Sequence, residues 1–105
     1  MIGLVSVNYN NPKYSEIFLD SILASHFDEP VLIILVDNSL DETNIKQLQE
    51  VVKKKRERIK EINSKFILEL HESGINGGYA SGINIGVKLC IEKGCGEIIA
   101  SNNDI

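Results

Sequence analysis

Residues 74–86 read Gly-Ile-Asn-Gly-Gly-Tyr-Ala-Ser-Gly-Ile-Asn-Ile-Gly, between an apolar run at 66–70 and a helical pattern that continues to Lys93. The first three glycines suit a tight turn, because glycine adopts positive φ without steric cost and lets the backbone approach a ligand. Gly82 and Gly86 fall inside the predicted helix, where each costs roughly 1 kcal/mol relative to alanine. Two such glycines on one helical face predict close packing, either against a strand or under a bound ligand.

Strands and helices alternate along the chain. Apolar runs rich in β-branched residues predict strands at 2–7, 31–36, 66–70 and 97–101, and helical spacing predicts helices at about 12–24, 41–62 and 78–93. Unbroken apolar strands fit a parallel sheet that is covered on both faces. The sequence therefore predicts an α/β protein of order β-α-β-α-β-α-β, a three-layer α/β/α domain with a mainly parallel sheet.

Two helix starts have sequence signals of their own. Asn11-Pro12 matches an N-cap followed by proline in the first helical position. Asp41 is predicted to cap the second helix. The charge run at 53–60 within that helix is predicted to be a solvated face.

Length and composition limit the class of protein. The chain has 105 residues, enough for one domain spanning 1–105, and a net charge of −4. A main partnership with nucleic acid would favour a strongly basic face, so nucleic acid is excluded as the main partner. No apolar run approaches the roughly 20 residues of a membrane-spanning helix. The first residues, Met-Ile-Gly-Leu-Val, lack the basic region and cleavage signal of a secretory leader, so we expect a cytoplasmic protein, with a peripheral place at the inner membrane face as the alternative.

Cysteine use fits a reduced compartment. Cys90 and Cys95 are too few for a disulfide framework and lack the CxxC spacing. Cys90 lies among apolar residues and is predicted to be core, and Cys95, between two glycines, is predicted to be incidental. The chain ends at Asn-Asn-Asp-Ile directly after an apolar run, so we expect it to be part of a larger protein.

Polar clusters fall where the predicted strands end. They are Asn8-Tyr9-Asn10, Asp37-Asn38-Ser39, the segment from His71 onward, and Asn102-Asn103-Asp104. In parallel α/β sheets, ligands bind outside the carboxyl ends of the strands, at the point where the strand order reverses. The sequence therefore predicts a ligand site at this edge of the sheet.

Each candidate at this edge also has a purely structural explanation. Asp37 can accept a hydrogen bond from the imide N–H of a pyrimidine or from ribose, or it can stabilise a turn. Tyr9 can stack on a base or pack as an ordinary amphipathic side chain. Asp104, with Asn102 nearby, can hold Mg²⁺ or Mn²⁺ through oxygen ligands, although Asn-Asn-Asp is also a common turn sequence.

The position of the glycines argues against one class of enzyme. In dinucleotide-binding Rossmann domains the glycine-rich loop follows the first strand. Here residues 7–11 read Val-Asn-Tyr-Asn-Asn, and the glycines follow the third strand. This order disfavours a Rossmann-like oxidoreductase.

Taken together, these motifs resemble the inverting glycosyltransferases of family 2, which have the GT-A fold, and especially the rhamnosyltransferase-like branch. The resemblance covers essentially the whole chain but only the N-terminal, nucleotide-binding part of such an enzyme. Residues 7–10 look like the first-strand motif and residues 36–39 like the second-strand motif. Residues 76–86 match the family's Asn-x-Gly-Phe/Tyr-Ala-x-Gly-x-Asn-x-Gly segment almost position for position, which is the most specific match.

The resemblance implies a binding site for a UDP- or dTDP-linked sugar. By residue, the implied substrate-binding set is Tyr9, Asn10, Asp37, Asn38, Asn76, Gly78, Tyr79, Asn84, Asn102 and Asn103. Residues 102–104 are similar to the branch's variant of the DXD motif, with Asp104 as the carboxylate that binds Mn²⁺ or Mg²⁺. The interval from Asp37 to Asp41 is one residue shorter than in the family, so Asp37 is the carboxylate that is carried over.

The implied reaction is a single displacement at the anomeric carbon by an acceptor hydroxyl of a glycan or a lipid-linked glycan, in polysaccharide or cell-surface glycan synthesis. The catalytic base is expected beyond Ile105, so we expect the isolated chain to be inactive. Two alternatives remain: a non-catalytic nucleotide-binding module of the same fold, and the disfavoured oxidoreductase. If the fourth strand is a free sheet edge, pairing through it would give a homodimer.

Overall fold

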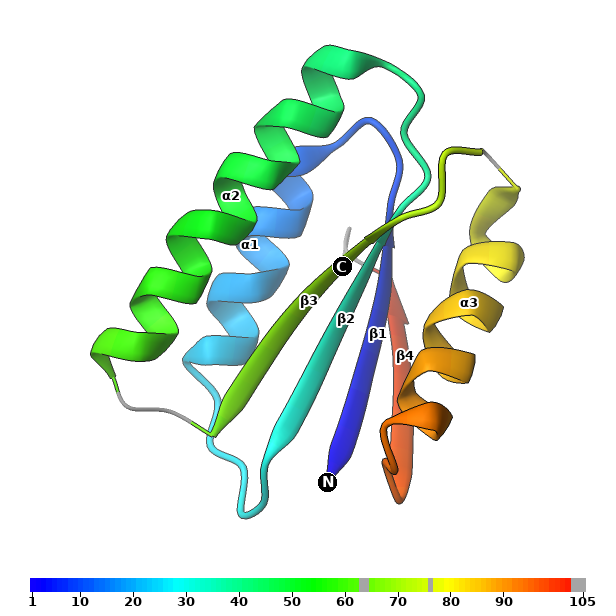
Figure 1. Ribbon diagram of the computed structural model, residues 1–105. Helices are drawn as coiled ribbons and strands as arrows, with labels where there is room; N and C mark the ends of the chain where they lie inside the picture. Colours follow the sequence, from blue (N-terminus) through cyan, green and yellow to red (C-terminus); the bar gives the residue numbers. More distant parts are fainter. Residues whose placement is uncertain (63–64, 76, 103–105) are drawn as a thin grey trace.

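The computed structural model describes residues 1–62, 65–75 and 77–102, and it confirms the predicted alternation of strands and helices (Figure 1). The elements are β1 (Ile2–Asn8), α1 (Pro12–Leu23), β2 (Val31–Asp37), α2 (Glu42–Glu61), β3 (Phe66–Glu72), α3 (Gly78–Glu92) and β4 (Glu97–Asn102). The four strands form one parallel sheet in the order β3-β2-β1-β4. Helices α1 and α2 cover one face and α3 covers the other, which gives the predicted three layers (Figure 1).

The register of the sheet aligns the carboxyl ends of the strands. Asn8 of β1 lies opposite Asp37 of β2, and Asp37 lies opposite Glu72 of β3. On the other side of β1, Val7 lies opposite Asn102 of β4. The chain turns from β1 outward to β2 and β3 and then returns to β4, so the strand order reverses beside β1. This is the position where such sheets bind ligands.

The starts of α1 and α2 follow from local capping. The Asn11 side chain accepts a hydrogen bond from the backbone N–H of Tyr14 at 3.3 Å, with Pro12 at the first helical position. The Asp41 side chain accepts one from the N–H of Asn44 at 3.3 Å. Both predicted N-caps are therefore confirmed, and each satisfies a backbone donor that the first helical turn leaves unpaired.

Two apolar cores form, one on each face of the sheet. Leu4 and Ile33 face Phe18, Leu19 and Leu48 of α1 and α2 on the first face, while Val5, Val7 and Ile34 share the second face with Cys90 of α3. The alternation follows from the period of two along a strand. Strand β2 is buried throughout, because it lies inside the sheet and both of its faces are covered.

Gly82 and Gly86 bring α3 against β1. A Cβ atom on Gly82 would lie 2.7 Å from Cγ2 of Val7, and one on Gly86 would lie 2.2 Å from Cγ1 of Val5. The helix therefore approaches the strand closely only because these two side chains are absent. The sequence offered two explanations for this pair of glycines, and the structure confirms close packing against a strand.

The charge run at 53–60 is mostly solvated, as predicted, but two of its members hold α2 in place. Lys55 is only 15% exposed, and its Nζ lies 2.6 Å from Oδ1 of Asp20 on α1. Arg56 donates from Nε to the backbone carbonyl of Leu68 on β3 at 3.0 Å. This bond covers part of the outer edge of β3, whereas β4 forms the opposite edge of the sheet.

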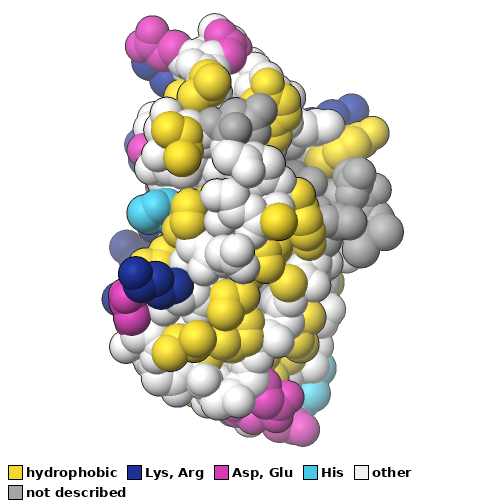
Figure 2. All heavy atoms as spheres, turned by 90° about the vertical axis from the view of Figure 1, so that its right-hand side faces the viewer, with side chains coloured by type: hydrophobic (Ala, Val, Ile, Leu, Met, Phe, Trp, Pro, Cys, Tyr) yellow, Lys and Arg dark blue, Asp and Glu magenta, His cyan; other side chains and the backbone are white. Residues whose placement is uncertain are grey.

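The outer surface of α3 keeps an apolar character. On this helix Ile91 is 63% exposed, and Tyr79 is also exposed. Figure 2 shows hydrophobic side chains spread along the face on which α3 lies. Among the helices of the described ranges, none is long and apolar enough to cross a membrane.

Candidate functional site

A buried polar network joins the carboxyl ends of β1 and β2. Asn8 donates from Nδ2 to Oδ1 of Asp37 at 3.1 Å and to Oγ of Ser39 at 3.3 Å. Ser15 of α1 donates its hydroxyl to Oδ1 of Asn8 at 2.7 Å. The Ser39 backbone N–H donates to Oδ1 of Asp37 at 3.0 Å. All four side chains are buried, so these bonds fix the two strand ends against each other and against α1.

The loop after β1 is fixed by the same network. The backbone N–H of Asn10 donates to Oγ of Ser39 at 2.8 Å. Asn10 has a φ of 52°, in the left-handed region, which asparagine tolerates better than most residues. The loop therefore turns outward after Asn8, and Tyr9, which is 50% exposed, stands at the rim of the edge.

One oxygen of this network has no hydrogen-bond partner among the described residues. It is Oδ2 of Asp37, a residue that is only 1% exposed. Buried polar atoms in folded proteins are almost always hydrogen-bonded, since an unpaired one loses its hydration without compensation. Oδ2 of Asp37 is therefore an acceptor for a donor that the described part of the chain does not supply.

A second group of bonds links β2, β3 and the start of α3. Asn38 donates from Nδ2 to the carbonyl of Gly78 at 3.0 Å. Ser73 donates its hydroxyl to Oδ1 of Asn38 at 2.7 Å, and its backbone N–H donates to the carbonyl of Asp37 at 3.0 Å. Gly78 has a φ of 84°, so the absence of a side chain is required there. These bonds hold the glycine segment beside the network.

Ser73 was missed by the sequence reasoning. It follows β3 directly and precedes Gly74, which has a φ of 71°. A serine at the end of a parallel strand and before a glycine turn is a usable signal, because its hydroxyl reaches backbone groups of the turn. Of the three glycines predicted for the turn, Gly74 and Gly78 have positive φ, but Gly77 has a φ of −86°.

The predicted binding residues separate into three groups. The first group, Asp37 and Asn38, is buried and takes part in the hydrogen bonds described above. The second group is exposed around them and consists of Tyr9, Asn10, Gly78 and Tyr79. Asn84 is exposed on α3 two residues after Gly82, which places it roughly 200° around the helix from the face that packs on β1. Asn76, Asn103 and Asp104 lie outside the described residues, as does the side chain of Asn102.

For the predicted metal site, the structure therefore gives only the position of the Asn102 backbone. Asn102 ends β4 opposite Val7 of β1, so β4 ends at the same edge of the sheet as Asp37. Within the ranges that the structure covers, no group of three or more His, Cys, Asp or Glu side chains is placed to hold a metal ion.

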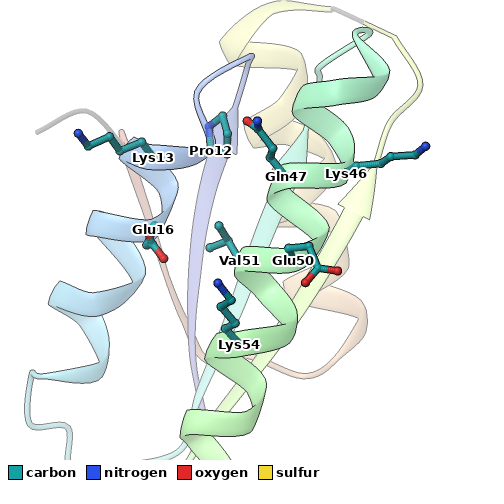
Figure 3. Close-up of a pocket in the computed structure, with 8 residues that line it drawn as sticks. All are labelled: Pro12, Lys13, Glu16, Lys46, Gln47, Glu50, Val51 and Lys54. Atoms are coloured by element: carbon teal, nitrogen blue, oxygen red, sulfur yellow. The ribbon is translucent and has the colours of Figure 1, made fainter.

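A separate groove of about 440 Å³ lies between α1 and α2 (Figure 3). It is lined by Pro12, Lys13, Glu16, Lys46, Gln47, Glu50, Val51 and Lys54. Lysines and glutamates alternate around it, and it shares no residue with the two groups of bonds at the carboxyl edge.

Comparison with known proteins finds structures with a similar fold. No family model matches the sequence, and no curated protein matches it. The chain is similar to a crystal structure of S. aureus TarS, with a TM-score of 0.69 and 20% identity over 98% of this chain and 16% of that chain. A structure of TarS residues 1–349 matches with a TM-score of 0.68 and 20% identity, over 98% of this chain and 27% of that one. The chain thus spans well under a third of either structure, and it shares the fold of the part of TarS that it matches.

Proposed function

We propose that this chain is the donor-binding part of a glycosyltransferase that takes a sugar from a nucleoside-diphosphate donor and transfers it with inversion to an acceptor hydroxyl, in the synthesis of a cell-surface glycan. Three independent features support the proposal: the glycosyltransferase-like fold, the match of residues 76–86 to the segment of family 2 enzymes, and the polar groups at the carboxyl edge. The observation that carries it is Oδ2 of Asp37, a buried acceptor without a donor in the described residues.

In this proposal the nucleoside binds at the ends of β1 and β2. The imide N–H of uracil or thymine donates to Oδ2 of Asp37, and the exposed ring of Tyr9 stacks on the base. Because Asp37 is covered in the free protein, the side chains above it must shift as the base enters. A buried carboxylate that gains a donor discriminates strongly against a ligand that lacks one.

The glycine segment serves the rest of the donor. Asn38 and Ser73 fix the carbonyl of Gly78, and the missing side chain at Gly78 leaves the backbone open to close approach. Tyr79 stands beside it in the first turn of α3, with its ring half exposed. These groups would border the ribose and the diphosphate.

The last residue of β4 and the two residues after it complete the proposed donor site. Asp104, together with Asn102 and Asn103, would hold Mn²⁺ or Mg²⁺, for which carboxylate and amide oxygens are suitable ligands. The position of β4 supports this assignment, because the strand ends beside β1 at the edge of the sheet where Asp37 lies. When bound, such a cation neutralises the charge that develops on the departing diphosphate. The catalytic base and the acceptor site would lie in the remainder of a longer protein.

A calorimetric titration with UDP and with dTDP, each with and without Mn²⁺, tests the proposal. We expect one nucleotide to bind in a metal-dependent manner, Asp104→Ala to remove the metal dependence, and Asp37→Asn to weaken binding at least tenfold. Asp41→Asn is the matched control, since it removes the same charge four residues away and asparagine is an equally good N-cap. Circular dichroism of each variant verifies folding.

The outcomes separate the candidate functions. If folded wild-type protein binds neither nucleotide, or if Asp37→Asn binds as wild type does, the donor site is not where we place it. Nucleotide binding without sugar transfer in the longer protein would identify a non-catalytic module. Binding of a nicotinamide dinucleotide in place of UDP or dTDP would favour the oxidoreductase alternative.

A further inference from the structure

The two cysteines both lie beside Gly3, at the end of the sheet opposite the proposed donor site. Cys90 is fully buried in the last turns of α3, and Cys95 is partly exposed in the connection to β4. A Cβ atom on Gly3 of β1 would lie 2.6 Å from the Sγ of Cys90 and 3.1 Å from the Sγ of Cys95. Both sulfur atoms therefore occupy the space that the missing side chain of Gly3 leaves open.

The backbone explains why these two side chains meet. The N–H of Cys95 donates to the carbonyl of Cys90 at 3.0 Å, and the N–H of Gly94 donates to the carbonyl of Ile91 at 3.0 Å. Gly94 has a φ of 82°. This is the Schellman arrangement of a helix C-terminus, in which the third-last helical residue and the second residue beyond the cap commonly touch. Here both of those residues are cysteines, so Cys95, which the sequence predicted to be incidental, has a defined partner.

We propose that Cys90 and Cys95 form a site of reversible disulfide modification that closes the connection between α3 and β4. The bond would link two residues five positions apart whose sulfur atoms both lie beside Gly3. Both thiols are free in the structure, and the partial exposure of Cys95 gives an oxidant access to one of them.

The chemistry needs one equivalent of a low-molecular-weight disulfide such as oxidised glutathione. The Cys95 thiolate attacks one sulfur of glutathione disulfide, forming a mixed disulfide and releasing one glutathione thiol. Cys90 then gives up its proton and attacks the Sγ of Cys95, releasing the second. The protein loses two hydrogen atoms and one glutathione disulfide is reduced to two thiols. Burial raises the pKa of the Cys90 thiol to about 11, and Cys95 and Glu69 add to the shift, so Cys95 is the thiol that reacts first.

The disulfide would act on the scaffold. It would tie the last turn of α3 to the residues that enter β4, and so hold the Gly94 turn in its left-handed conformation. The inference is independent of the proposed function, because it uses no residue of the carboxyl edge.

The test incubates the full chain with a glutathione redox buffer, blocks remaining thiols with N-ethylmaleimide and measures the intact mass. We expect a species that has lost two hydrogen atoms and carries no maleimide, and whose peptide map links residue 90 to residue 95. Cys90→Ser should stop at the mixed disulfide with glutathione on Cys95, and Cys95→Ser should remain unmodified. The oxidised chain should melt roughly 9 °C higher than the reduced chain.

Gly94→Ala is the control for geometry, because it keeps both thiols but disfavours the left-handed turn. We expect its mixed disulfide to close at least several-fold more slowly than that of the wild type. Three results would overturn the proposal: two maleimides on folded, oxidant-treated protein, a disulfide between chains on a non-reducing gel, or equal closure rates in Gly94→Ala and wild type. The wild-type mass spectrum decides the matter even if a cysteine variant does not fold.

Discussion

Replacement of Gly86 by alanine is the most direct test of the contact between α3 and β1. The new Cβ atom would lie 2.2 Å from Cγ1 of Val5 and 3.2 Å from its Cβ and Cγ2. Apolar carbons pack at about 3.5–4.0 Å, so the helix and the strand would have to separate by more than 1 Å at this point. Val5 is completely buried and β-branched, and β-branched side chains have few alternative rotamers.

The expected magnitude follows from two opposing terms. Inserting a methyl group into a packed core costs about 1–3 kcal/mol, and this contact lies at the upper end because the obstacle is a buried side chain on an inner strand. Alanine in place of glycine in a helix recovers roughly 1 kcal/mol. The net result is a loss of about 2 kcal/mol in the free energy of unfolding, which corresponds to a decrease in Tm of about 8–10 °C for a domain of this size.

Urea unfolding followed by circular dichroism measures the loss, and a thermal scan checks the shift in Tm. Gly96→Ala is the matched control, since a Cβ atom there meets nothing within 4 Å. It should change the stability by less than about 0.5 kcal/mol. The double variant Val5→Ala/Gly86→Ala should be more stable than the sum of its single effects by roughly 1 kcal/mol, because removing the γ-methyl groups relieves the clash.

The reasoning is wrong if Gly86→Ala melts at or above the temperature of the wild type. That result would mean that helix propensity outweighs packing here and that α3 lies farther from β1 than the structure places it. Strict additivity in the double variant would equally contradict a direct contact between the two positions.

Three further predictions concern the site and the thiols. Gly82→Ala would place a Cβ atom 3.1 Å from Nδ2 of Asn38, so we expect it to weaken UDP binding in calorimetry severalfold more than Gly86→Ala does. Ser15→Ala would leave Oδ1 of the buried Asn8 without its hydroxyl donor, and should lower the free energy of unfolding in urea by about 1–3 kcal/mol. Because burial raises the pKa of Cys90 from 9.0 to about 11, its contribution to stability is complete below pH 9 and is lost as the pH rises toward 11. Urea midpoints of wild type and Cys90→Ala should therefore converge or cross over this interval, and a constant difference would contradict the assignment.

The element boundaries were predictable because their signals are local. The Asn11 and Asp41 side chains cap the helix that follows each of them, and the apolar runs of β1 and β2 are set by neighbouring residues alone. The placement of polar clusters at strand ends was predictable for the same reason, once the strands were taken as parallel. The sequence pattern thus determined the fold class and the edge of the sheet at which a ligand site was predicted.

The tertiary structure alone decided which residues meet. The bond between Asn8 and Asp37 joins positions 29 residues apart, and that between Asn38 and Gly78 joins positions 40 apart. Such contacts depend on strand order and register, which a local pattern does not encode, because a shift of one residue turns every side chain to the opposite face. The unpaired Oδ2 of Asp37, the role of Ser73 and the meeting of the two cysteines beside Gly3 are consequences of that register and of the way α3 crosses the sheet.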